Sequence, residues 1–198
     1  VVGVNIGRNR SVSNEDAVKN YVECLKEIHE VADYIEVNVS SPNTPDLRDL
    51  QQEASLSQLL EALKAANYEL GEKPLLVKVA PDLTTSEIES IADICISTGI
   101  SGVVATNTTI TRPGIDANVA ERIGYGGLSG KPLKKMSACV VRTLYECTDG
   151  KLPIVGVGGI FSAEDAFESI AAGASLVQVY TGFIYGGPTF PHDICVRL

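Results

Sequence analysis

The sequence predicts an α/β fold of the (β/α)8 barrel type, incomplete, with about six of the eight β/α units. Short β-branched runs alternate with helical patterns along the chain, which favours a parallel sheet. Runs such as "LLVKVA" and "IVGVG" are apolar on both faces, as in strands covered from both sides. Every expected strand ends in polar residues or glycine. A barrel brings all these ends to one mouth, whereas a doubly wound sheet needs one switch point, so we prefer the barrel.

The expected strands are spread over the whole chain. They cover residues 1–6, 34–39, 75–79, 102–106, 153–157 and 175–180. A complete barrel has eight strands and typically about 250 residues, so roughly a quarter of the wall is missing. We therefore expect residues 1–198 to form a single domain that is part of a longer catalytic domain.

The helices between the strands begin at recognisable residues. Thr84 and Glu87 predict a capping box, and Ser162 with Asp165 predicts a weaker one. Ser13 is the expected cap of a helix that runs through residue 31. The connection over residues 107–130 holds no clear element, and a connection of that length is usually functional.

Composition excludes several classes of protein. A net charge of −9 argues against binding to nucleic acid, which needs a basic surface. No apolar run reaches the roughly 18 residues of a membrane-spanning helix. No signal peptide is visible, although the chain begins at Val1 and such an absence carries little weight. The five cysteines form no CxxC pair. Four lie in helical patterns, where we expect small core side chains in a reducing compartment.

Few residues are available for acid–base chemistry. The two histidines, His29 and His192, lie outside the polar motifs, which argues against a His-based triad or a metal site. The remaining candidates are Ser41, Lys78 and Ser129. Serine is a poor base at its free pKa and needs a partner to pass the proton on. Thr44 is the next hydroxyl after Ser41 in the motif.

Polar clusters at the strand ends suggest a flat, hydrogen-bonding ligand. "NVSSPNT" carries Asn38, Ser41 and Asn43, and "TNTT" carries Thr106 and Asn107 with two further threonines. Neutral amides and hydroxyls offer both donors and acceptors to such a ligand.

Two glycines after the fifth strand predict a phosphate site. In "IVGVGGIFSAEDA", Gly158 and Gly159 precede a capped helix, and backbone amides near a helix N-terminus can hold phosphate. The next strand ends at Tyr180-Thr181, and barrels often bind phosphate with the loops after their last two strands. Phe161 breaks the GxGxxG dinucleotide pattern, and a plain tight turn is the alternative.

Lys78 lies in the middle of the third strand. Within a barrel its side chain would point inward, where a lysine is costly unless it is paired or used. Its possible roles are a Schiff base or a cation beside developing negative charge. The alternative is an outward lysine that passes a helix.

Seven motifs occur in one order along almost the whole chain: "GVNIGRN", "NVSSPNT", "VKVAPDL", "TNTT", "GGLSGKPL", "PIVGVGG" and "GASLVQVYT". Together they resemble class 2 dihydroorotate dehydrogenase, the quinone-linked FMN enzyme of pyrimidine synthesis. The resemblance implies oxidation of dihydroorotate to orotate, with FMN as hydride acceptor and a ubiquinone-type quinone as final acceptor.

The resemblance also implies roles for individual residues. Ser41 matches the catalytic base, with Thr44 beside it, and Lys78 matches the lysine at the flavin ring. The substrate positions are Asn38, Asn43, Asn107 and Thr108. The FMN positions are Asn5, Asn38, Lys78, Thr106, Ser129, Gly130, Gly158, Gly159, Tyr180 and Thr181.

Two departures from the family stand out. Asp46 replaces the usual glycine of the family's "NTPGLR", and aspartate would tolerate a positive φ there at modest cost. The family's first two strands and its N-terminal quinone-tunnel helices have no counterpart. Membrane contact through that N-terminal region, at the mitochondrial inner membrane or a bacterial cytoplasmic membrane, is therefore implied only for a longer protein.

Three alternatives remain open. Class 1 dihydroorotate dehydrogenase or dihydropyrimidine dehydrogenase is disfavoured by serine at position 41. An aldolase-like barrel would use Lys78 as a Schiff base. The third alternative is that the segment by itself is a non-catalytic fragment.

Overall fold

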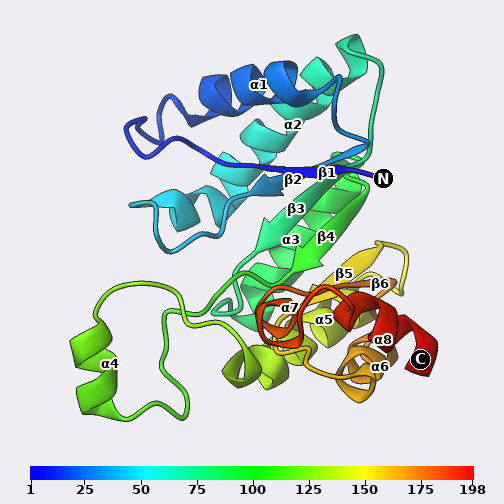
Figure 1. The fold of residues 1–198 in the computed structure, drawn as a ribbon. Coiled ribbons are helices and arrows are strands. Elements are labelled where there is room, and N and C mark those ends of the chain that lie inside the picture. The colour runs from blue at the N-terminus through cyan, green and yellow to red at the C-terminus, as the bar shows by residue number, and fades with distance from the viewer.

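The computed structural model describes residues 1–198 as a curved wall of six parallel strands, with the main helices against its outer side (Figure 1). The strand order is β1-β2-β3-β4-β5-β6, without the reversal that a doubly wound sheet would show. The strands are β1 (Gly3–Ile6), β2 (Tyr34–Asn38), β3 (Leu75–Val79), β4 (Gly102–Ala105), β5 (Ile154–Val157) and β6 (Leu176–Gln178). The prediction of an incomplete barrel is thus confirmed.

Helices follow the strands in the expected alternation. They are α1 (Ala17–Ile28), α2 (Glu53–Glu69), α3 (Thr85–Ser97), α4 (Ala117–Ile123), α5 (Lys134–Cys147), α6 (Ala163–Ala171), α7 (Thr181–Gly186) and α8 (Phe190–Arg197), with 3-10 turns at Leu47–Gln51 and Lys131–Leu133. The short α4 lies in the 107–130 connection, for which the sequence predicted no element, and projects from the body (Figure 1).

Helix starts agree with the sequence at two of three places. Thr84 and Glu87 form a reciprocal capping box at α3, and the Ser162 side chain accepts from the Asp165 N–H at α6. The prediction for Ser13 is wrong, because α1 begins at Ala17 after Asp16, without a side-chain cap. Ser13 Oγ accepts instead from the Asp16 N–H at 3.4 Å, in the turn before the helix.

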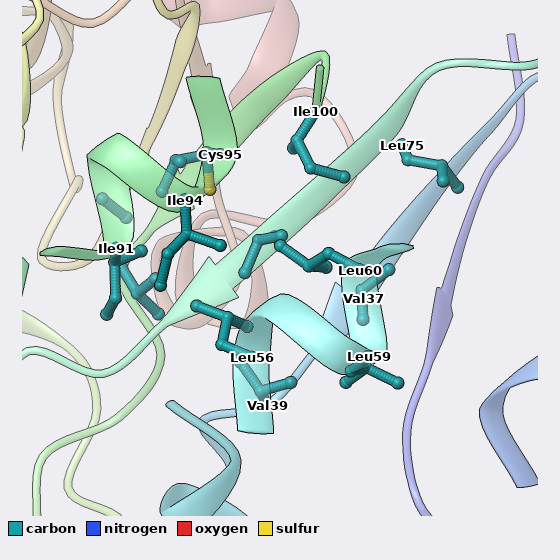
Figure 2. Packing of buried hydrophobic residues seen from close by; sticks show 14 of the residues in the cluster. Val37, Val39, Leu56, Leu59, Leu60, Leu75, Ile91, Ile94, Cys95 and Ile100 are labelled. Carbon is teal, nitrogen blue, oxygen red and sulfur yellow. The ribbon is translucent and has the colours of Figure 1, made fainter. Parts of the chain in front are cut away.

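The main core lies between the sheet and the outer helices. A cluster of 33 buried residues joins the outward side chains of the strands to α1, α2, α3 and α5. Figure 2 shows part of it, with Val37 from β2 beside Leu60 from α2, and with Ile91 and Cys95 on α3. Alternation along β3 explains the arrangement, since Leu75, Val77 and Val79 are buried while Leu76 and Lys78 are half-buried.

The expectation that the cysteines in helical patterns serve as core side chains is mostly wrong. All five lie in helices, but only Cys95 is buried, and Cys24 is half-buried. Cys139, Cys147 and Cys195 lie on exposed helix faces. None of the helices combines the length and apolar character that crossing a membrane requires.

The two edge strands each have one partner. β1 pairs only with β2, and β6 only with β5, so the wall does not close on itself. The inner side of both edges is open: Leu176 is 66% exposed, and Gly3 and Asn5 are also exposed. The strands in the middle of the wall keep their outer cover.

Candidate active site

A cavity of about 540 Å³ lies at the C-terminal ends of the strands. The arrowheads of β3 and β4 mark this end of the sheet in Figure 1. The volume falls within the range of small-molecule and cofactor sites. Thirteen of the predicted site residues line it: Asn5, Asn38, Asn43, Lys78, Thr106, Asn107, Thr108, Ser129, Gly130, Gly158, Gly159, Tyr180 and Thr181. Parallel strands explain this convergence, because their C-terminal ends share one edge.

Lys78 points into this cavity. Its Nζ lies 2.8 Å from Glu36 Oε1 and donates to Gln178 Oε1 at 3.1 Å. The side chain of Lys78 is 15% exposed and that of Glu36 is 5% exposed. The prediction of an inward lysine is confirmed, and the alternative of an outward lysine is wrong.

Asn38, Asn107 and the buried Ser40 form a hydrogen-bonded amide cluster at the mouth of the cavity. Asn107 Nδ2 donates to Asn38 Oδ1 at 3.1 Å and to Ser40 Oγ at 3.0 Å. Asn107 Oδ1 accepts from the Thr108 N–H at 2.8 Å. These bonds fix which face of each amide looks into the cavity.

An ion pair supports this cluster from behind. Arg48 Nη1 lies 2.8 Å from Asp82 Oδ2, and both side chains are largely buried. Arg48 also donates to the carbonyls of Ser40 at 3.1 Å and Thr108 at 2.8 Å. One guanidinium thus joins the loops after β2, β3 and β4, in the fixed geometry that arginine provides.

Ser41 and Thr44 do not line the cavity wall. Ser41 is half-buried in the loop after β2, and its Oγ accepts from the Asn43 N–H at 3.3 Å. No hydrogen bond joins Ser41 to Thr44. Tyr125, from the 107–130 connection, donates to the Pro42 carbonyl, so the two loops meet beside Ser41.

The loop after β5 adopts a conformation that requires glycine. Gly158 has φ +129° and Gly159 has φ +74°. A Cβ on Gly159 would lie 2.6 Å from the Lys134 Cα, so this loop packs directly on the start of α5. Thr181 Oγ1 donates to Ser129 Oγ at 3.1 Å, which brings the loop after β6 to the same end of the cavity.

Ion pairs between α5 and α6 support the loop at Gly158 and Gly159 after β5, called the glycine loop below. Lys134 Nζ lies 2.5 Å from Asp165 Oδ1 and 2.9 Å from Glu168 Oε2, and these hydrogen bonds raise the pKa of the Lys134 ammonium. Burial opposes ionisation of Asp165, but its bonds to Lys134 and the Phe161 N–H lower its pKa. Asp165 thereby ties the loop to the first turn of α6.

Sequence reasoning missed two polar residues of the cavity wall, Glu36 and Gln178. Both lie inside strands that are otherwise apolar, as Lys78 does. A polar residue in an apolar strand, the pattern that identified Lys78, could have identified both of them. No three His, Cys, Asp or Glu side chains gather as a metal site would need.

One atom of the site is buried without a hydrogen-bond partner. Thr108 Oγ1 is covered, and a Cβ on Gly127 would lie 1.9 Å from it. A buried hydroxyl without a partner costs free energy. The fit of the cavity to a polar, phosphate-bearing ligand rests instead on its amide side chains and on the loop at Gly158 and Gly159.

Comparisons with known proteins agree with this geometry. The family model described as "Dihydroorotate dehydrogenase" matches residues 1–198. A protein named dihydroorotate dehydrogenase (quinone) from Anaeromyxobacter sp. (strain Fw109-5) is 50% identical over 190 residues, covering 96% of this chain and 52% of the relative. The protein of the same name from Shewanella sp. (strain W3-18-1) is 49% identical over 199 residues, covering 98% and 58%.

A solved structure shows the same architecture. The crystal structure of DHODH from Eimeria tenella in complex with ferulenol matches with a TM-score of 0.90 and 39% identity, covering 98% of this chain and 56% of that one. The chain thus spans little more than half the length of these relatives. It belongs to the dihydroorotate dehydrogenase family.

Proposed function

We propose that the full-length protein containing this chain oxidises dihydroorotate to orotate in pyrimidine synthesis and passes the electrons to a quinone. The observation that carries the proposal is the convergence of the amide cluster, Lys78 and the glycine loop on one cavity. The relatives named as quinone-dependent dihydroorotate dehydrogenases support the choice of substrate and acceptor.

The cavity fits FMN as the cofactor. Gly158, Gly159 and Thr181 would hold its phosphate, with Gly130 and Tyr180 beside them, and Asn5, Thr106 and Lys78 would face its ring. When bound, FMN supplies the two-electron acceptor of the reaction. The backbone amides near the start of α6 favour an anion there.

The amide cluster suits the substrate. Asn38, Asn43, Asn107 and Thr108 present donors and acceptors to a flat ring with a carboxylate. Ser41 would take the C5 proton at its Oγ, and Thr44 would pass the proton on.

The arrangement of Lys78 disfavours the Schiff-base alternative. A lysine nucleophile must be neutral to attack a carbonyl. Lys78 Nζ is instead held in an ion pair with Glu36 at 2.8 Å and in a hydrogen bond to Gln178, so it is not free to attack. A fixed cation suits stabilisation of negative charge on a reduced ring.

Location follows from the acceptor. Quinones dissolve in lipid, so the full-length protein would work at a membrane: the cytoplasmic membrane in a bacterium or the mitochondrial inner membrane in a eukaryote. The relatives from Anaeromyxobacter and Shewanella favour the bacterial case. Contact would be made by an N-terminal region of the full-length protein.

The test uses the purified full-length protein. We expect a yellow protein whose flavin is bleached by dihydroorotate without oxygen and recovers its colour with a soluble ubiquinone analogue. Reduction by dihydrouracil, or reoxidation only by fumarate or NAD, would favour the dihydropyrimidine or class 1 enzymes. A colourless protein trapped by borohydride with an aldehyde would reject the proposal.

A further inference from the structure

Glu36 is a buried carboxylate that the proposed reaction does not use. It lies on β2, is 4% exposed, and lines the cavity with its side chain directed to the inside of the barrel. A buried carboxylate is costly unless it is paired and hydrogen-bonded. The hydrogen-bond partners of Glu36 therefore identify the residues that stabilise its carboxylate and the residue that it positions.

Glu36 joins three polar residues from three other strands. Its Oε1 accepts from Asn5 Nδ2 on β1 at 2.5 Å and pairs with Lys78 Nζ on β3 at 2.8 Å. Its Oε2 accepts from Gln178 Nε2 on β6 at 3.4 Å. Gln178 Oε1 in turn accepts from Lys78 Nζ, so the three side chains Glu36, Lys78 and Gln178 close a ring.

The pair determines the charge of the cavity. Lys78 and Glu36 are the only charged residues in its wall. The formal charges cancel, so the cation that would face a bound flavin is largely compensated. In a partly desolvated site, charges a few ångströms apart interact far more strongly than in water.

We propose that Glu36 is a positioning residue that holds the Lys78 ammonium and lowers the reduction potential of the flavin bound in this cavity. The inference rests on the proposed function, since it requires FMN in the cavity. Reduction by two electrons and one proton leaves the flavin with one more negative charge. A carboxylate close to Lys78 weakens the stabilisation of that charge, so reduced flavin binds less tightly than it would beside an uncompensated lysine.

The test compares three variants in the full-length protein loaded with FMN. Glu36→Gln removes the charge and keeps the shape, Glu36→Asp keeps the charge, and Glu72→Gln removes a charge from the exposed pair with Lys64. Potentials are measured by equilibration with a reference dye. We expect Glu36→Gln to raise the preference for reduced over oxidised FMN about tenfold, or about 30 mV for a two-electron couple.

The controls separate charge from packing. Glu36→Asp should remain close to the unmodified protein, and Glu72→Gln should not change the potential. An unchanged potential in Glu36→Gln, or an equal shift in Glu36→Asp, would overturn the inference and leave the proposed function standing. Failure of the unmodified protein to bind FMN would overturn both.

A second measurement does not require flavin. In the FMN-free protein, loss of the Glu36 carboxylate releases Lys78 Nζ from its ion pair. The Nζ reacts as the neutral amine, so acylation of Lys78, followed by peptide mass spectrometry, should be several-fold faster in Glu36→Gln. Lys64 labelling should rise instead in Glu72→Gln. Equal Lys78 labelling in the unmodified protein and Glu36→Gln would overturn the positioning role.

Discussion

Ser41 lies in the loop after β2, and its Oγ accepts from the N–H of Asn43, which lines the cavity. If it takes the substrate proton, Ser41→Ala should slow flavin reduction by dihydroorotate roughly 10²–10⁴-fold, the usual contribution of positioned proton transfer. FMN affinity should not change, because the glycine loop lies elsewhere in the cavity. Stopped-flow bleaching of the full-length protein measures both the rate and the flavin content.

The control for Ser41 is Ser57→Ala on α2, which removes a hydroxyl that bonds only Glu61 on the surface. This variant should reduce its flavin at the rate of the unmodified protein. Bleaching by Ser41→Ala at that same rate would reject the assignment of Ser41 as the base.

Asp46 adopts a conformation that few side chains accept. Its φ is +56°, in the left-handed region, so Asp46 does adopt the positive φ that the sequence analysis considered for this position. A β-branched residue is strained there, and Asp46→Val should lower the free energy of unfolding by about 1–2 kcal/mol, whereas Asp46→Gly should be neutral or slightly stabilising. Urea denaturation of the full-length protein measures this. Asp49→Val, without positive φ, is the control, and an equal loss there would contradict the backbone explanation.

At the scale of elements, the loop after β5 depends on its second glycine. Gly159→Ala meets both a strained φ and the backbone of Lys134, so the loop must move away from α5. We expect FMN to bind at least about tenfold more weakly, since a displacement of the phosphate contacts of this size costs about 1.4 kcal/mol or more. Titration of the apoprotein with FMN measures the change in affinity.

Gly71→Ala provides a matched control for this loop. Gly71 has φ +96° with nothing within 4 Å of an added Cβ, so it carries the conformational cost without any effect on the cavity. Its FMN affinity should stay unchanged. Equal affinity in Gly159→Ala and the unmodified protein would show that the loop does not hold the phosphate.

The start of α3 contributes stability that depends on pH. The Thr84 N–H and hydroxyl donate to Glu87 and lower its pKa below the usual carboxyl value. A lowered pKa stabilises the folded state above the ordinary carboxyl pKa, and the contribution is lost as the pH falls through the folded value. Thr84→Ala should cost about 1 kcal/mol at pH 7 and less below about pH 4.

The measurement is denaturant unfolding of Thr84→Ala at several pH values. Thr143→Ala, a helix-interior threonine of α5, serves as the control and should be neutral or slightly stabilising at every pH. The prediction is contradicted if the loss of unfolding free energy in Thr84→Ala is the same at every pH, because the cap would then act without the ionisation of Glu87.

The elements were predictable where one local pattern determines them. Apolar runs located all six strands, although several end earlier than expected. Ser13 was misjudged because a serine before a helix resembles a cap whether or not its Oγ reaches the first turn. The cysteines were misjudged because helical spacing does not tell which face of a helix packs inward. Glu36 and Gln178 escaped notice because their partners lie on strands far away in the sequence.

At the scale of the molecule, the open wall explains where the sequence could and could not predict burial. The inner faces of β1 and β6 are partly wet, as expected: Leu176 is 66% exposed. β3 loses part of its cover, on the inner side of the wall, whereas β4 is buried throughout. Leu75, Val77 and Val103 face the outer helices, which are all present, and are fully buried. Only inward residues such as Leu76 stay half-buried.

The open edges set the behaviour of residues 1–198 when they are expressed alone. Sheet edges with unpaired N–H and C=O groups promote association, and a barrel avoids this only by closing. β1 and β6 each have one unpaired edge, and each large apolar side chain left exposed forgoes roughly 1.5–3 kcal/mol. A few such losses rival a typical domain stability of 5–15 kcal/mol. We expect aggregation or partial folding, weak FMN binding and no turnover. Thermal melting and the visible spectrum of the purified segment test this, and a cooperative melt from a yellow monomer would contradict it.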